Sequence, residues 1–168
     1  LAAFAALTGL IVWQSLEART EKLRDASAHL LQNTQLTAAS QQFIAAKANA
    51  ILSGLMLRPE LRPGAPAADC PRTLAAALKL DAEFLNMGKA LPDGEIVCSA
   101  VPTTNRVNVA DRSYFRQALK SHAMVVGDAI IGRYVGKPVI TFARAMRDAA
   151  GRVTGVFFVS LNLEWLHG

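Results

Sequence analysis

The sequence predicts an α+β fold in which a long N-terminal helix packs on an antiparallel sheet of about five strands, covered by short helices. Three observations lead to this prediction. A long stretch without proline, from Ser15 to about Leu57, carries an apolar stripe at helical spacing. Short apolar runs separated by turn residues fill most of the remaining chain. One charged amphipathic segment, 112–121, lies between these runs and predicts a covering helix.

The composition favours a single globular domain with an appended element. The chain has 168 residues, of which 52% are hydrophobic and 18% charged, so it is too apolar to be disordered. Its formal net charge is +5, but the basic residues are scattered singly rather than interleaved with aromatic residues. We therefore expect no nucleic-acid partner.

Residues 1–14 are expected to be the end of a truncated transmembrane helix. The sequence begins without Met, and no charge precedes Glu17. A bilayer span takes about 20 apolar residues, so this shorter run predicts a helix cut from a longer chain, with Trp13 at the membrane interface. A signal-peptide core or a buried soluble helix are the alternatives, but the helical pattern continues without a cleavage site.

Residues 15–58 are expected to form one long amphipathic helix that leaves the membrane. Leucines recur every seven residues at Leu16, Leu23 and Leu30, and the only glycine between residues 15 and 58 is Gly54. Such a helix can pack along its own domain, or its first half can pair with the same helix of a second subunit. Both are possible in different halves, and we expect a homodimer through this helix.

The segment after this helix predicts a loop, a short helix and a β-hairpin. Prolines between 59 and 66 end the long helix, and Cys70–Leu80 suits a helix with proline in its first turn. Phe84–Leu91 and Glu95–Val101 read as strands joined by the Pro-Asp-Gly turn at 92–94.

The second half of the chain predicts one helix and three further strands. Asp111 is expected to cap a helix over Arg112–Ser121. Met124–Ile131, Pro138–Met146 and Val153–Leu163 are apolar runs separated by turn-rich segments. We expect an antiparallel sheet with one covered face, which leaves room for a small-molecule pocket.

Cys70 and Cys98 are the only cysteines. Two thiols with no histidine nearby do not make a zinc site, and we expect neither a metal nor a cofactor. If the domain lies outside the cytoplasm, a disulfide between them is the natural reading, and two buried free thiols are the alternative. No catalytic motif is present, so we expect no enzymatic activity in this part of the protein.

Several short motifs, taken in order, resemble one known family. They are Asp111-Arg112-Ser113-Tyr114-Phe115, Gly132-Arg133 with Gly136-Lys137-Pro138, Arg147-Asp148 with Gly151, Gly155-Val156, Leu161 and Leu163 with Leu166, and Pro92-Asp93-Gly94 with Cys98-Ser99. Together with the long helix they resemble the extracytoplasmic sensor domains called dCache or PDC domains, which occur in bacterial histidine kinases, diguanylate cyclases and chemoreceptors. The resemblance covers nearly all of the chain.

This resemblance implies a PAS-like sensor module over residues 59–168, with a ligand pocket between its sheet and the covering loops. It also implies a receptor of the bacterial inner membrane, with this domain in the periplasm and an output domain of the same chain, a histidine kinase or diguanylate cyclase, in the cytoplasm. The N-terminal helix would pass the conformational signal through the membrane.

The resemblance also implies candidate ligand-binding residues. Arg112, Tyr114 and Phe115 match a motif in which arginine binds the carboxylate of an amino acid and aromatic residues close the pocket. At the positions where such members hold an ammonium group with carboxylates, this chain has Gly132 and Ser160. The candidate ligand-binding residues also include Arg133, Tyr134 and Arg144. Arg112, Tyr114, Ser160 and these three residues together favour a small carboxylate or another anion as the ligand.

Structural roles are the alternatives for these residues. Asp111 could form an ion pair with Arg112. The side chains of Tyr114 and Phe115 could be part of the ordinary core, and those of Arg133 and Arg144 could face solvent. Two other functions also remain open. One is a membrane-anchored dimerisation domain without a ligand, which a wholly apolar core would favour. The other is a cytoplasmic PAS-like regulatory domain, which reduced cysteines would favour.

Overall fold

The computed structural model describes residues 40–62, 68–102 and 105–167. The expected membrane segment and most of the long helix lie outside these residues. A helix covers residues 40–57 of the described chain and is called the N-terminal helix below. The chain divides into two compact units, Leu1–Ile44 and Ala45–Gly168, and the second contains the sheet. None of the described helices combines the length and the apolar character needed to cross a membrane.

Five antiparallel strands form one sheet in the order β2-β1-β5-β4-β3. The strands are β1 (Phe84–Ala90), β2 (Ile96–Ser99), β3 (Val125–Ile131), β4 (Pro138–Arg147) and β5 (Val153–Asn162). Gly94 and Gly151 have φ of 88° and 80° in two of the turns that the sequence predicted. The predicted α+β fold is confirmed.

Short helices connect and cover the strands. They are η1 (Pro59–Leu61), α2 (Asp69–Leu78), α3 (Ser113–Lys120) and η2 (Glu164–His167). The expectation that Asp111 caps α3 is wrong, because the N-cap residue is Arg112 and no side chain makes a cap hydrogen bond there. The carboxylate of Asp111 instead binds Arg133.

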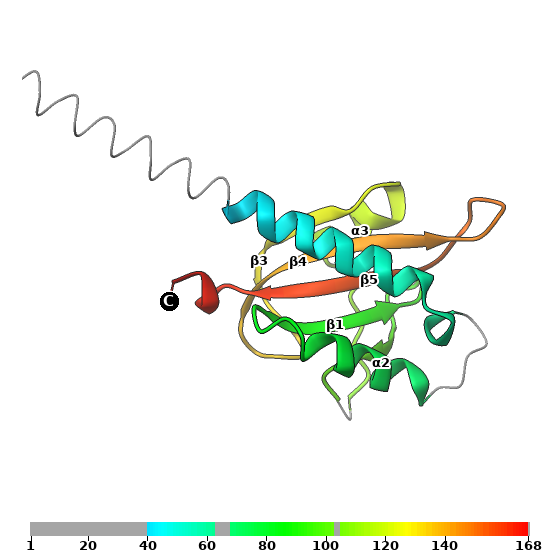
Figure 1. The fold of residues 1–168 in the computed structure, drawn as a ribbon. Coiled ribbons are helices and arrows are strands. Elements are labelled where there is room, and N and C mark those ends of the chain that lie inside the picture. The colour runs from blue at the N-terminus through cyan, green and yellow to red at the C-terminus, as the bar shows by residue number, and fades with distance from the viewer. Residues whose placement is uncertain (1–39, 63–67, 103–104, 168) are drawn as a thin grey trace, which may run out of the picture. The chain divides into compact units, whose positions relative to one another are not determined.

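The N-terminal helix and α2 cover one face of the sheet (Figure 1). Ala48, Leu52 and Leu55 are buried at helical spacing. The Nζ atom of Lys47 lies 2.6 Å from Oδ1 of Asp81 and also binds Glu83, so ion pairs anchor the helix to the loop before β1. The predicted disulfide between Cys70 and Cys98 is confirmed, with a Cα–Cα distance of 6.1 Å, and it joins α2 to β2.

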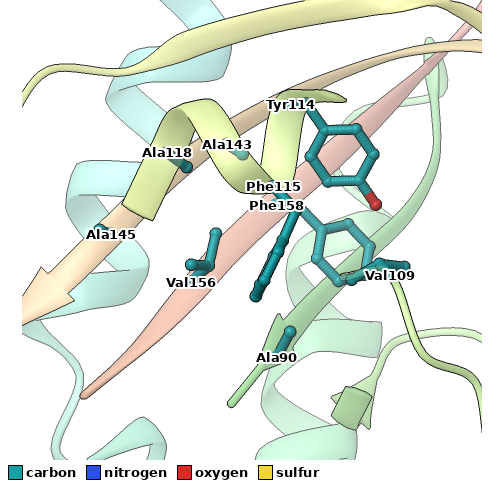
Figure 2. Close-up of a cluster of buried hydrophobic side chains, with 9 residues drawn as sticks. All are labelled: Ala90, Val109, Tyr114, Phe115, Ala118, Ala143, Ala145, Val156 and Phe158. Carbon is teal, nitrogen blue, oxygen red and sulfur yellow. The ribbon is translucent and has the colours of Figure 1, made fainter. Parts of the chain in front are cut away.

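The helix α3 and the segment before it cover the opposite face, so both faces are covered rather than one. Figure 2 shows Tyr114, Phe115 and Ala118 of α3 reaching towards the sheet, where Val156 and Phe158 of β5 meet them. The buried cluster consists of Ala90, Val109, Tyr114, Phe115, Ala118, Ala143, Ala145, Val156 and Phe158. This apolar packing holds α3 in place beside the site described below.

Candidate functional site

Three buried polar side chains form a row across the α3 face of the sheet. Asn86 of β1 lies opposite Ser160 of β5, and Ser160 lies opposite Thr141 of β4. Residues paired in this way share a face of the sheet. Asn86, Ser160 and Thr141 are only 2%, 7% and 2% exposed, although the rows beside them are apolar. We call these three residues the polar row.

Hydrogen bonds fix the side chains of the polar row. The Oγ atoms of Thr141 and Ser160 are 3.2 Å apart. The Oδ1 atom of Asn86 accepts hydrogen bonds from Ser99 Oγ at 2.9 Å and from the backbone nitrogens of Met87 at 2.8 Å and Val101 at 3.2 Å. Three donors on one side of the amide set its orientation and direct its NH₂ group away from them.

A small cavity lies over the polar row. Its volume is about 30 Å³, which is room for about two water molecules. Its polar lining adds four side chains to the row: Arg112, Tyr114, Arg133 and Tyr134. Its apolar lining includes Ile96, Val107, Val109, Ile130, Val135 and Phe158. The walls come from α3, the segment before it and the turn between β3 and β4 (132–137).

Tyr114 places a hydroxyl group in the cavity wall. The residue is 5% exposed, and its hydroxyl makes no hydrogen bond within the described part of the chain. Burial raises the pKa of Tyr114 to about 12, so the hydroxyl stays protonated at neutral pH. Figure 2 shows this hydroxyl at the end of the apolar cluster opposite Ala118 and Ala145. The hydroxyl therefore lies at the cavity as a hydrogen-bond donor without a partner in the described residues.

The two arginines of the cavity differ in their partners. The Nη2 atom of Arg112 donates to the carbonyl oxygen of Ile131 at 3.3 Å, and none of the ion pairs within the described residues involves this side chain. Arg133 binds both carboxylate oxygens of Asp111, at 2.8 and 2.6 Å. The hydrogen bonds from Arg133 lower the pKa of Asp111, so this carboxylate stays charged. Arg112 is therefore the cation without a carboxylate partner at this cavity.

The structure brings together most of the ligand-binding residues predicted from the sequence, but not all. Arg112, Tyr114, Arg133, Tyr134 and Ser160 line the cavity. Phe115 lies instead in the apolar cluster, where it is 1% exposed.

Arg144 lies on the opposite face of the sheet from the cavity. Its Nη1 atom donates to Ser53 Oγ of the N-terminal helix at 2.9 Å. Sequence reasoning missed Asn86 and Thr141, although a polar residue inside an apolar strand is a signal that could have identified both.

A wider hollow lies beside this cavity. It has a volume of about 380 Å³ and is lined by Pro71, Arg106, Ile96 and Tyr134, among others. Ile96 and Tyr134 line both spaces, so they separate the inner cavity from the outer hollow. We favour the smaller space as the binding site because the polar row and Tyr114, which line it, are buried, whereas Arg106 is almost fully exposed. Within the described residues, no group of His, Cys, Asp or Glu could hold a metal ion.

Comparison with known proteins places this fold among sensor domains. No family model matches the sequence. Sporulation kinase D of Bacillus subtilis (strain 168) is 27% identical over 73 residues, which is 44% of this chain and 14% of that protein. The extracellular domain of rpHK1S-Z16, described as a histidine kinase, matches with a TM-score of 0.65 and 21% identity, covering 77% of this chain and 53% of that domain.

A second solved structure is the ligand-binding domain of the Pseudomonas aeruginosa PAO1 amino acid chemoreceptor PctC in complex with GABA. It matches with a TM-score of 0.61 and 20% identity, covering 79% of this chain and 61% of that domain. This chain thus spans between half and two thirds of the length of these domains. It has the fold of the extracellular sensor domains of histidine kinases and chemoreceptors, and the predicted resemblance is confirmed at the level of the fold.

Proposed function

We propose that this domain is the ligand-sensing input domain of a bacterial membrane receptor and that it binds a small carboxylate in the cavity over the polar row. The observation that carries the proposal is the hydroxyl of the buried residue Tyr114, which lines the cavity with Arg112 and the polar row and makes no hydrogen bond within the described residues. Together these groups provide one cation and several neutral donors, which complement a carboxylate and leave an ammonium group without a charged partner.

Each group has a specific role in this proposal. Arg112 binds the carboxylate through its guanidinium group, and Tyr114 donates a hydrogen bond to one carboxylate oxygen. Asn86, Thr141 and Ser160 hydrogen-bond a hydroxyl or carbonyl group on the ligand, whereas Val107, Val109 and Phe158 contact its apolar part. PctC, which shares the fold, was solved with GABA, which also carries a carboxylate.

The size of the cavity restricts the ligand. A space for about two water molecules is smaller than acetate, so the cavity must widen when a ligand enters. The turn between β3 and β4 is the wall that can move, because Gly132 and Gly136 flank Tyr134, whereas Tyr114 of α3 is held in the buried apolar cluster. Ligands with few atoms are therefore favoured.

Two contacts provide a route for the signal from the sheet to the N-terminal helix. Thr141 of the polar row and Arg144 belong to β4, and Arg144 binds Ser53 on the helix. Lys47, which lies nearer the N-terminus of the helix than Ser53, binds Asp81 and Glu83 next to β1. A displacement of β4 or β1 by a ligand would shift the helix, which we propose continues into the membrane from the periplasm.

Structural observations also bear on the two alternatives. A ligand-free dimerisation domain would need no buried polar residues beside a cavity, but the polar row and Tyr114 are buried and line one. A cytoplasmic regulatory domain would keep its thiols reduced, whereas Cys70 and Cys98 form a disulfide, which suits the periplasm. We propose further that the complete protein carries a cytoplasmic histidine kinase or diguanylate cyclase domain and that this domain itself is not catalytic.

We also propose a homodimer through the N-terminal helix. Ala46, Ala50, Gly54 and Leu57 are exposed along one side of the helix at spacings of three or four residues, and Leu57 is 74% exposed. A glutamate at Ala50 would place charge in such an interface. We expect Ala50→Glu to shift the mass measured by light scattering from dimer to monomer, and an unchanged mass would exclude this interface.

The test of the carboxylate site is a thermal-shift and calorimetric screen of the oxidised protein against acetate, propionate, lactate and GABA. A carboxylate that binds the folded state raises the midpoint with concentration. We expect Arg112→Gln to weaken binding about ten- to hundredfold, because a hydrogen bond to a charged group is worth about 1.5–3 kcal/mol.

Arg152→Gln is the matched control for the Arg112 variant. It removes the same charge from the exposed turn between β4 and β5 and should leave binding unchanged. Binding of GABA without binding of acetate, propionate or lactate would contradict the preference for an anion. The absence of any binding would contradict the whole site.

A further inference from the structure

One ion pair joins the two walls of the cavity. Arg133 belongs to the turn between β3 and β4, and Asp111 belongs to the segment before α3. The Nη1 and Nη2 atoms of Arg133 lie 2.8 and 2.6 Å from the two carboxylate oxygens of Asp111, and Nη1 also donates to the carbonyl oxygen of Asn108. This is the bidentate geometry with which arginine binds a free carboxylate.

We infer that Asp111 is a built-in competitor that occupies Arg133 and is displaced when the carboxylate of a ligand binds there. This inference rests on the proposed carboxylate site. Arg112 and Arg133 both line the cavity, whereas Asp111 is not among the residues that line it. A carboxylate inside the cavity therefore approaches Arg133 from the cavity side and exchanges with Asp111, so that Arg112 and Arg133 hold the ligand together.

The exposure of the pair makes such an exchange feasible. The side chain of Arg133 is 40% exposed and that of Asp111 is 61% exposed, so water can solvate Asp111 as soon as it leaves. Exposed ion pairs contribute little to stability, and the competitor therefore lowers the affinity for the ligand without preventing binding. Asp111 would set the affinity of the sensor for carboxylates.

Displacement of Asp111 would also release the wall that has to move. The ion pair and the Asn108 contact hold the turn that carries Tyr134 against the segment before α3. Once Asp111 has left, the side chain of Arg133 keeps its hydrogen bond to the Asn108 carbonyl oxygen as its one remaining link to that segment among the described residues, and the cavity can widen. Ligand binding at Arg133 and opening of the wall would then be one event.

The test is a double-mutant cycle on the affinity for acetate and propionate. Calorimetry measures the Kd of both anions for the wild type, Asp111→Asn, Arg133→Gln and the double variant, all oxidised. We expect Asp111→Asn to bind about two- to fivefold more tightly than the wild type, which corresponds to the strength of an exposed ion pair. In the Arg133→Gln background the same substitution should give no gain.

Asp148→Asn is the matched control. Asp148 also pairs with an exposed arginine, at 2.8 Å from Nε of Arg152, but it lies in the turn between β4 and β5 and does not line the cavity. The Asp148→Asn substitution removes the same charge as Asp111→Asn and should leave the Kd values for acetate and propionate unchanged. Thermal unfolding checks that every variant is folded, and Asp111→Ser replaces Asp111→Asn if the latter does not fold.

The outcomes separate this inference from the function on which it rests. Unchanged or weaker binding by Asp111→Asn, with normal binding by the wild type, overturns the competitor and leaves the carboxylate site intact. A gain that persists without Arg133, or that also occurs in Asp148→Asn, overturns it as well. If neither anion binds any of the variants, the carboxylate site itself is wrong.

Discussion

Tyr114→Phe removes one oxygen atom from the cavity wall and leaves the aromatic ring in the apolar cluster. We expect opposite effects on stability and on binding. Tyr114 is buried, and its hydroxyl lines the cavity without a hydrogen bond within the described residues. A hydroxyl that nothing solvates costs about 1–3 kcal/mol. Because the cavity has room for about two water molecules, part of this cost is offset. The free energy of unfolding should therefore stay the same or rise by up to about 1 kcal/mol.

Binding should weaken in the same variant. Loss of one neutral hydrogen bond to the ligand costs about 0.5–1.5 kcal/mol, which is about a two- to tenfold rise in Kd for the carboxylate that binds best among acetate, propionate and lactate. Urea unfolding with and without that carboxylate measures both quantities. A fall in unfolding free energy of more than about 1 kcal/mol would show that the hydroxyl has a structural partner. An unchanged Kd would show that it does not contact the ligand.

Phe115→Leu is the matched control for this experiment. Phe115 is the next residue of α3, is 1% exposed and does not line the cavity. Its replacement should lower the unfolding free energy by about 1 kcal/mol and leave the Kd unchanged. The pair of neighbouring variants therefore separates loss of core packing from loss of a ligand contact.

Three further predictions concern the scaffold. Replacing Cys70 and Cys98 with serine should lower the unfolding free energy by about 3–4 kcal/mol, because the disulfide joins residues with a sequence separation of 28. A loss below about 1 kcal/mol in urea unfolding would contradict this prediction. Gly88→Ala should lower the unfolding free energy by about 1–3 kcal/mol, because the new Cβ would lie 2.3 Å from the ring of Phe158. At Gly54 a new Cβ would meet nothing within 4 Å, so Gly54→Ala should stabilise the helix. Equal effects of the two substitutions in thermal unfolding would refute this packing. Ultraviolet titration should find Tyr114 ionising at about pH 12, because burial raises its pKa, with Tyr114→Phe losing that step. Since the unfolded chain releases this proton near pH 10, stability should fall between about pH 10 and 12, and a normal titration would contradict the burial of Tyr114.

Local patterns predicted most of the fold and part of the site. Turn residues such as Gly94 and Gly151 marked the ends of the strands, so the predicted strand and helix boundaries lie within a few residues of those observed. Arg112 and Tyr114 could be identified because they belong to one short motif at the start of α3. Both line the cavity.

Long-range pairing explains what the sequence did not reveal. Asp111 resembled a helix cap, but its partner Arg133 is 22 residues away along the chain, and only the fold brings them together. Arg144 is three residues from Thr141 and therefore points to the other face of β4. The sequence alone could not tell which face carries the cavity, because a shift of one residue in strand register exchanges the faces.

Nuclear magnetic resonance mapping of the bound carboxylate tests the central claim most directly. Titration of the ¹⁵N-labelled, oxidised protein with propionate would be followed on the Asn86 side-chain amide, the Nε–H group of Arg112 and the backbone amides of 132–137. A ligand over the polar row should shift these signals in a saturable way and leave those of Arg106 and Lys120 unchanged. Shifts confined to Arg106 and the outer hollow, or to the exposed side of α3, would contradict the site.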